Sequence, residues 1–381
     1  MKIYVISGEK SGDFIGGLLM KALREVGSKQ RNKIEFHGVA GENMESSGLK
    51  SLFPLEEINL MGFVEVIPHI FRINKLINRT VKDIIDKNPK TLVTIDSPGF
   101  TFRVAKKVKK LAPHIKLVHI VAPSVWVYKP ERAQKYADIY DHMLTLLTFE
   151  PKYFTQLGLA STCIGHPVLE QDFYKSSAKL RNEMKIEDDV KAIAVTPGSR
   201  RGEIVRHMPI IKDIFNKLSI MHKIKVIFVQ SDESNIALIT ELLRDARFNY
   251  SFSTDRLKAF AASDCALAKS GTNTLEIAAS RTPMVVGYKL NPVTFSILKL
   301  FIKIKFASLI NIMANREIIP EYIQSDFDVD YVALSISNLL NDDQKAKKQI
   351  DESKKVLKSL GLGAKEKPSM IAAKIIADIS G

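Results

Sequence analysis

The feature that most constrains this fold is the regular alternation of short apolar runs with longer amphipathic stretches. Short apolar runs are typical of buried strands, and amphipathic stretches between them are typical of helices that connect parallel strands. The sequence therefore predicts βαβ units and an α/β fold. In the first half of the chain, strands are predicted at 3–7, 35–39, 92–95, 117–121, 143–147 and 162–164, and helices at 12–26, 68–87 and 102–111.

The same alternation starts again after a polar stretch at 171–191, which is the predicted join between two domains. We expect two Rossmann-like, doubly wound domains at 1–170 and 171–341, followed by helices at 342–381 that pack on the first domain or on a partner subunit. Sheets of this kind bind ligands at the carboxyl ends of their strands, so the two domains are expected to face a substrate-binding cleft. The second set of strands is predicted at 192–196, 226–230, 250–253, 265–268 and 284–287.

The chain of 381 residues has a formal net charge of +14, which favours a polyanionic partner such as nucleic acid, anionic lipid or a phosphorylated substrate. We expect no membrane-spanning segment, because the most apolar stretch, 293–313, is interrupted by three lysines. We also expect no signal peptide, since the first strand begins almost at once. Cys163 and Cys265 lie far apart without partner histidines, so we expect a reducing cytoplasm and neither a disulfide nor a zinc site.

A glycine-containing loop, Gly-Glu-Lys-Ser-Gly-Asp at 8–13, follows the first predicted strand and opens the first helix. Backbone N–H groups at such a helix start attract anions and sugar hydroxyls, so Ser11, Gly12 and Asp13 are candidate ligand contacts. The spacing is not that of a dinucleotide-binding loop. The alternative is a tight turn in which Ser11 or Asp13 only caps the helix.

Two further loops follow strands of the second domain. The first, at 196–203, contains Ser199, Arg200 and Arg201 at a helix start, a combination that suits a diphosphate and the charge that develops on a departing nucleoside diphosphate. The second, at 270–276, offers small residues and an acid that can bind phosphate or ribose hydroxyls. Its candidate residues are Gly271, Thr272 and Glu276. Capped helices with solvated arginines are the alternative.

Asp96 comes directly after a predicted strand and begins an Asp-Ser-Pro-Gly bend. A carboxylate in that place can deprotonate an acceptor hydroxyl, and burial would make it more basic. The alternative is an aspartate that caps the turn. His166 is either a hinge or ligand contact or a packed histidine. The acids at 326–330 precede a helical run, so helix capping is favoured over a metal site there.

Taken together, these segments resemble the lipid-A-disaccharide synthase family, which comprises inverting glycosyltransferases of the two-Rossmann (GT-B) class. The resemblance runs from end to end. It implies transfer of 2,3-diacylglucosamine from UDP-2,3-diacylglucosamine to 2,3-diacylglucosamine 1-phosphate (lipid X), with UDP carried by the donor and no further cofactor or metal. Its most specific motifs lie at 8–13, 61–66, 95–100, 123–126, 149–150, 165–167, 197–200, 270–272 and 283–288.

The resemblance also implies roles for individual residues. Asp96 matches the proposed catalytic aspartate, and Arg200 matches an arginine assigned to UDP and the active site. Tyr288 and Asn311 fall in segments on the nucleotide side. The family's second aspartate in the 95–101 motif is replaced here by Gly99.

Apolar residues interleaved with basic ones gather at 63–79, a composition that suits acyl chains or an anionic membrane surface. The alternative is that many of them face the domain core. The expected contacts are Phe63, Val66, Ile67, Phe71 and Arg72. The resemblance thus predicts peripheral association with the cytoplasmic face of the inner membrane, and it allows a homodimer.

Two other functions stay open. The first is a different enzyme of the same fold, either a UDP-sugar epimerase or a transferase that acts on another lipid acceptor. The second is a non-catalytic polyanion binder, suggested by the charge of +14. It is disfavoured because no nucleic-acid-binding module is recognisable and Trp126 is the only tryptophan. We therefore expect no nucleic-acid partner.

Overall fold

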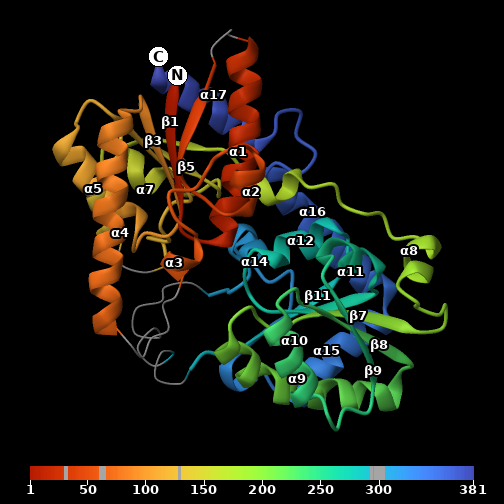
Figure 1. Cartoon of the computed structure of the whole chain (residues 1–381). Helices are drawn as coiled ribbons and strands as arrows, with labels where there is room; N and C mark the ends of the chain where they lie inside the picture. The colour runs from red at the N-terminus through yellow and green to blue at the C-terminus, as the bar shows by residue number, and fades with distance from the viewer. Residues whose placement is uncertain (30–32, 60–65, 128–129, 292–294, 296–304) are drawn as a thin grey trace. The chain divides into compact units, whose positions relative to one another are not determined.

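The structure is a computed structural model that describes residues 1–29, 33–59, 66–127, 130–291, 295 and 305–381. The chain forms two compact units. Unit 1 consists of Met1–Glu170 and Gly363–Gly381, and unit 2 consists of Gln171–Leu362. The C-terminal segment is therefore divided between them, with its first helix in unit 2 and its last helix in unit 1 (Figure 1).

Unit 1 is built on a six-stranded parallel sheet with the order β2-β1-β3-β4-β5-β6. The strands predicted in this half are confirmed, with ends shifted by up to two residues. Ser7 pairs with Ile95 and Ile95 with Ile120, so β1, β3 and β4 end at the same level. The strands are β1 (Lys2–Ser7), β2 (Glu35–Val39), β3 (Thr91–Ile95), β4 (Lys116–Ile120), β5 (His142–Thr145) and β6 (Ala160–Cys163).

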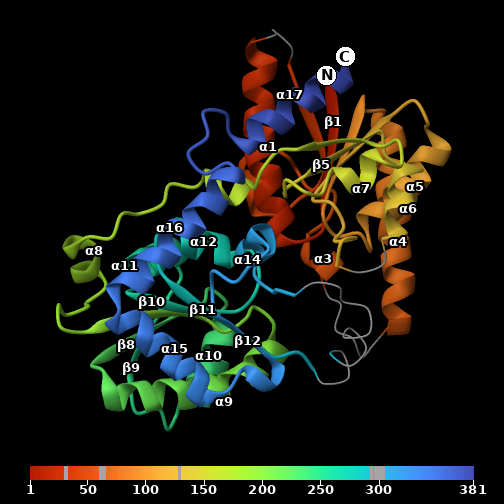
Figure 2. The ribbon, with the colours of Figure 1, turned by 180° about the vertical axis from the view of Figure 1, so that it is seen from behind.

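Helices cover both faces of this sheet, which explains why its strands are almost continuously apolar. On one face α1 and α17 pack together over Ile3, Val5 and Val93. On the other face α4, α5 and α6 pack over Tyr4 and Leu92 (Figures 1 and 2). The helices of unit 1 are α1 (Lys10–Lys29), α2 (Glu42–Ser46), α3 (Glu56–Asn59), α4 (Val66–Lys87), α5 (Thr101–Leu111), α6 (Arg132–Ala137), α7 (Lys152–Thr155), the 3-10 helix η1 (Pro167–Glu170) and α17 (Pro368–Ser380).

Unit 2 repeats the design with a second six-stranded parallel sheet, ordered β12-β11-β10-β7-β8-β9. Five of its strands were predicted. The sixth, β12, is only three residues long and contains a charged Glu321, so it lacks the apolar run by which the others are recognised. The strands are β7 (Lys191–Thr196), β8 (Ile224–Val229), β9 (Asn249–Ser253), β10 (Cys265–Ala268), β11 (Met284–Tyr288) and β12 (Glu321–Ile323).

The core of unit 2 lies between its sheet and helices such as α9 and α15, where Ile193, Phe215, Phe228 and Ile336 are fully buried. The helices of unit 2 are α8 (Ala178–Glu183), α9 (Arg201–Met221), α10 (Glu233–Leu242), α11 (Arg256–Ala262), α12 (Asn273–Ala279), α14 (Leu309–Ala314), the 3-10 helix η2 (Gln324–Asp326), α15 (Val329–Asn341) and α16 (Asp343–Ser359).

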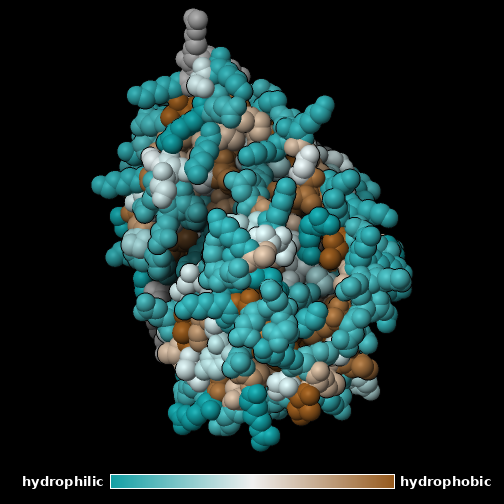
Figure 3. Space-filling view, turned by 90° about the vertical axis from the view of Figure 1, so that its right-hand side faces the viewer, coloured by the Kyte–Doolittle hydropathy of each residue, from teal (hydrophilic) through white to brown (hydrophobic). Residues whose placement is uncertain are grey.

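Several smaller expectations can be checked in the described residues. Asp328 caps α15 by accepting from the Asp330 and Tyr331 N–H groups, so the capping interpretation of 326–330 is confirmed. Both cysteines are free thiols. Of the helices in the described ranges, none has the length and apolar character needed to cross a bilayer. On the face seen in Figure 3, hydrophilic residues cover most of the surface, with hydrophobic residues scattered among them.

Candidate functional site

In unit 1, Asp96 directly follows β3. Its N–H donates to the Ile120 carbonyl at 3.0 Å, which extends the ladder to β4 by one residue. Asp96 and Ser97 then adopt φ values of +50° and +51°. This left-handed backbone costs about 1 kcal/mol or more for a residue other than glycine, and such strain is concentrated at functional sites. Burial raises the pKa of the Asp96 carboxyl above its usual range, the direction that makes a better general base.

The turn that follows Asp96 lies against the glycine loop. A Cβ atom at Gly8 would come within 2.3 Å of Ser97 Oγ, so only glycine allows this approach. By contrast, nothing lies within 4 Å of a Cβ built at Gly99. There is therefore open space where the family usually has its second aspartate.

The candidate residues of the glycine loop differ in their burial and in their hydrogen bonds. Asp13 is 2% exposed, and its carboxylate accepts from the Gly41 and Asn43 N–H groups at 2.8 Å and from Met44 N–H at 3.2 Å. It thus holds the start of α2 and has little capacity left for a ligand. Ser11 is exposed, and a Cβ at Gly12 would lie 3.3 Å from the Ile95 carbonyl oxygen. Of the three candidate residues of this loop, Ser11 is the one with an exposed side chain.

The Asp13 contacts predict a large loss of stability for Asp13→Ala. Removing the carboxylate leaves several N–H donors at the start of α2 without partners, which should cost about 3 kcal/mol. The melting temperature should fall by roughly 6–10 °C. Thermal unfolding followed by circular dichroism measures this effect. Ser11→Ala is the control and should melt within ~1 °C of the wild type; equal melting of the two variants would contradict the structural role of Asp13.

The predicted lipid-contact segment is only partly described. Phe63 lies outside the described residues, while Val66 and Ile67 begin α4. Phe71 is 75% exposed, and Arg72 pairs with Glu57 at 3.2 Å. Their neighbours Ile73, Leu76 and Ile77 are buried in the sheet-facing core. The core alternative is therefore confirmed for these three residues. Among the apolar candidates, Phe71 is the one whose side chain the structure describes, and it is exposed.

His166 is a packed histidine in the structure. It is 5% exposed, its Nδ1 accepts from Val168 N–H at 3.2 Å, and burial lowers its pKa to about 4. These properties match the packed alternative.

In unit 2, the loop between β7 and α9 wraps around the carboxylate of Glu203. The Ser199 and Arg200 N–H groups donate to Glu203 Oε2 at 3.3 and 3.5 Å. Gly198 has a φ of +131°, and a Cβ there would lie 2.8 Å from Glu203 Cβ, so the loop can close only with glycine. The side chains of Ser199, Arg200 and Arg201 remain exposed. The loop thus has a fixed backbone and free cationic side chains.

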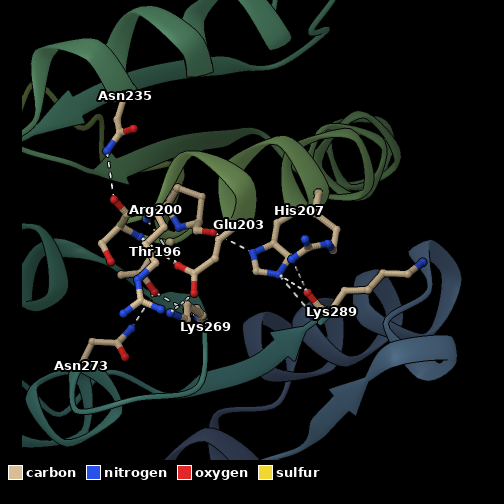
Figure 4. Close-up of polar contacts among 12 residues, drawn as sticks. Thr196, Arg200, Glu203, His207, Asn235, Lys269, Asn273 and Lys289 are labelled. Carbon is tan, nitrogen blue, oxygen red and sulfur yellow. Dashed lines mark hydrogen bonds and ion pairs between the residues drawn. The ribbon is translucent and has the colours of Figure 1, made fainter. Parts of the chain in front are cut away.

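This loop is tied to the loop after β10. Lys269 Nζ pairs with Glu203 Oε1 at 2.7 Å, and Asn273 Nδ2 donates to Thr196 Oγ1 at 2.7 Å (Figure 4). Lys269 N–H also donates to Thr196 Oγ1, at 3.1 Å. The structure therefore brings together the starts of α9 and α12, with Gly271 and the exposed Thr272 between β10 and α12. Two such helix starts have the N–H groups and dipole direction that favour an anion.

His207 fixes the same loop from the other side. Its Nδ1 lies 2.7 Å from the Pro197 carbonyl oxygen, and its Nε2 accepts from Lys289 N–H at 3.2 Å (Figure 4). Its Nε2 also lies 3.1 Å from the Lys289 carbonyl oxygen, and burial lowers the pKa of His207. The imidazole thus connects the 196–203 loop to the end of β11.

The charge around Glu203 is predominantly positive. Lys269 neutralises the carboxylate, and its Nζ lies 5.5 Å from the centre of the Tyr288 ring. Burial and then the charge of Glu203 raise the pKa of Tyr288, whereas the charges of Arg206 and Arg200 lower it. Arg200 N–H donates to Glu203, and Lys269 contacts both Glu203 and Tyr288, so these four residues form a cluster that has more cations than acids.

Glu276 and Asn311 lie in unit 2 but are engaged with protein groups. Glu276 is 5% exposed, and its Oε1 receives Arg256 Nε at 2.7 Å and Gln171 Nε2 at 2.9 Å. Asn311 is fully buried, donates to the Ile319 carbonyl at 2.7 Å and accepts from Ile319 N–H at 3.0 Å. Asn311 thereby holds the segment that leads into β12.

Sequence reasoning included Glu203 and Asn273 in the 196–203 and 270–276 loops without giving them a role, and it missed His207 and Lys269. Glu203 and His207 are one helical turn apart on the buried side of α9, and such buried polar pairs on one helix face are a usable signal. Lys269 and Asn273 flank the predicted 270–272 segment, but their partners Glu203 and Thr196 lie far away in sequence. In the described part of the chain, no group of three or more His, Cys, Asp or Glu side chains is arranged to hold a metal ion.

Comparisons with known proteins agree with these observations. The profile of the lipid-A-disaccharide synthetase family matches residues 3–375. The chain is 53% identical to a lipid-A-disaccharide synthase of Rickettsia bellii and 51% identical to that of Rickettsia prowazekii, in both cases over 98% of each chain. A solved structure of UDP-GlcNAc 2-epimerase from Neisseria meningitidis bound to UDP-GlcNAc is similar with a TM-score of 0.64 at 13% identity, over 99% of each chain. A glycosyltransferase from Rickettsia africae is similar with a TM-score of 0.56 at 12% identity, over 99% of this chain and 98% of that one. At these identities the two structural likenesses show the fold alone.

Proposed function

Because this chain belongs to the lipid-A-disaccharide synthetase family, we propose a mechanism in which unit 2 binds the donor nucleotide and Asp96 of unit 1 activates the acceptor. The enzyme is a UDP-sugar glycosyltransferase. It transfers 2,3-diacylglucosamine from UDP-2,3-diacylglucosamine to 2,3-diacylglucosamine 1-phosphate, with inversion, and it releases UDP and the β-1,6 disaccharide 1-phosphate.

The observation that carries the proposal is the cationic cluster formed by the paired loops of unit 2. The diphosphate of the donor binds at the starts of α9 and α12, where Ser199, Arg200, Arg201 and Thr272 have exposed side chains. Arg200 neutralises the charge that builds up on UDP as the glycosidic bond breaks. Tyr288 lies in the same cluster, and Glu276 accepts from ribose hydroxyls through its second carboxylate oxygen.

Asp96 accepts the proton of the attacking acceptor hydroxyl. Single displacement needs an attacking oxygen on one face of the anomeric carbon and a leaving group on the other, so one base and one anion site suffice. The raised pKa of Asp96 and its strained backbone support this role. In this scheme no metal is needed, because arginine, lysine and backbone N–H groups take over the charge of the diphosphate.

The acylated acceptor reaches the enzyme from the cytoplasmic face of the inner membrane. The exposed Phe71 and the basic residues around it support peripheral contact with anionic lipid. A homodimer is compatible with this scheme and is not required by it.

The test is a turnover assay with purified protein. Given both acylated sugars in detergent and a metal chelator, the enzyme should release one UDP per disaccharide formed, as measured by coupled UDP detection and mass spectrometry. An epimerase of this fold would instead change the configuration of the donor sugar and form no disaccharide. Formation of the epimer, or loss of turnover on chelation, would refute the corresponding part of the proposal.

A further inference from the structure

The carboxyl edge of the unit 1 sheet contains an indole that the mechanism above does not use. Trp126, the only tryptophan of the chain, lies in the loop that follows β4 and is partly exposed. Its Nε1–H donates to Glu150 Oε1 at 3.1 Å, and the Phe149 ring packs edge-on against it, with centroids 5.2 Å apart at 86°. The indole is therefore held in one orientation while part of it faces solvent.

The group that holds the indole is itself unusual. Glu150 is only 4% exposed, and its Oε2 accepts from Leu146 N–H at 3.2 Å and from Leu147 N–H at 3.0 Å. Burial raises the pKa of this carboxyl above its usual range, although the three hydrogen bonds act in the opposite direction. A buried carboxylate is costly, and here three N–H donors stabilise it, one of them the indole N–H. This arrangement fixes the direction of the indole.

Trp126 lies at the same edge of the sheet as Asp96. β3, β4 and β5 are parallel neighbours, so the residues that follow them meet at one edge. Asp96 follows β3, the Trp126 loop follows β4, and Glu150 follows β5. Val125, next to Trp126, packs in the same core cluster as Phe100, which follows the Asp96 turn. The indole and the proposed base are thus on adjacent segments over one face of the sheet.

A second observation at this edge also points to a ligand. Tyr136 of α6 is 3% exposed, yet its hydroxyl has no hydrogen-bond partner among the described residues. Its ring packs against Phe102, in the first turn of α5 after the Asp96 bend, and against His119 near the end of β4, with centroids 4.8 and 5.3 Å apart, so it lies at this edge of the sheet. Burial raises the pKa of Tyr136 to about 12. A buried hydroxyl without a partner is destabilising, and a ligand oxygen can provide that partner.

We propose that Trp126 is the platform on which the aminosugar ring of the acceptor packs, and that the Tyr136 hydroxyl hydrogen-bonds to the same sugar. One face of a pyranose ring presents C–H groups, which pack well on the electron-rich face of an indole, while its hydroxyls need polar partners. The platform sets the sugar so that its free hydroxyl points to Asp96. This inference rests on the proposed function and identifies where its acceptor binds.

Because the chain has a single tryptophan, selectively excited tryptophan emission reports on this position alone. The probe is a short-chain, water-soluble 2,3-diacylglucosamine 1-phosphate, titrated into the full-length enzyme. We expect a saturable change in emission with this probe and none with UDP or with a short-chain phosphatidate, which has acyl chains and phosphate but no sugar. An equal change with phosphatidate would indicate lipid binding only. A change seen only when the UDP-sugar donor is titrated instead would mean that the donor sugar binds at Trp126. Either result would overturn the proposal.

Kinetics give an independent readout. Trp126→Ala should raise the acceptor KM at least tenfold and leave the donor KM within twofold, whereas Trp126→Phe, which keeps a ring face, should recover most of the affinity. Tyr331→Ala, at an aromatic residue of unit 2 that is 63% exposed, is the matched control and should change neither constant. Folding of each variant is checked by its melting temperature. If the wild type forms disaccharide and folded Trp126→Ala keeps its acceptor KM, the platform is refuted and the proposed function stands. If the wild type forms none, the proposed function itself fails.

Discussion

Asp96→Asn should lower the turnover number by about 10³-fold, because loss of a positioned general base typically costs 10²–10⁴-fold. The substitution keeps the size of the side chain. It should also keep the fold, since asparagine tolerates the left-handed backbone that Asp96 adopts at φ +50° at least as well as aspartate does. UDP release measured under saturating substrates gives the rate, and calorimetric titration with UDP should show unchanged affinity.

The pH dependence tests the same residue in the wild type. The base must be deprotonated to act, so the rate should rise with pH through the pKa of Asp96. Burial raises that pKa, and the acid limb should therefore lie above the value of about 3.9 that is usual for aspartate. Asp86→Asn, at an exposed aspartate of α4, is the matched control and should keep the wild-type rate and profile. A wild-type rate in Asp96→Asn would remove Asp96 from the mechanism.

Arg200→Ala should lower kcat/KM by roughly 10²–10³-fold, the range found when a group that stabilises developing charge is removed. The guanidinium is exposed at the start of α9, beside the Lys269–Glu203 pair, so it is accessible to the diphosphate. Arg200→Lys should recover only part of the loss, because lysine keeps the charge but not the two-pronged hydrogen bonding of arginine.

The control for Arg200 is Arg244→Ala, at another exposed arginine of unit 2 that lies outside the paired loops. Both variants remove one positive charge, so a general effect of net charge would lower both rates equally. We expect the Arg244 variant to keep the wild-type kcat/KM. Equal rates in the two variants would show that Arg200 has no particular role in leaving-group departure.

The sequence by itself determined the fold class and nearly all of the strands. Runs such as Ile3–Ile6 bury every side chain, so their apolar character follows from two covered sheet faces and can be read without coordinates. It also placed Asp96 directly after a strand and Arg200 in the loop that follows another, because position relative to a strand end is local information. The strand β12 was not predicted because it has only three residues and contains Glu321, whose carboxylate accepts a hydrogen bond from Asn311.

The tertiary structure decided which polar residues work together. Asp13 appeared in the sequence as a ligand contact or helix cap of its own loop, but its partners are 28 and more residues away, at the start of α2. Glu203 with Lys269 and Trp126 with Glu150 likewise join segments that are 66 and 24 residues apart. Periodicity and loop composition report only on neighbours along the chain, whereas hydrogen bonds and ion pairs depend on distance in space, and that distance is fixed only when the strands pair.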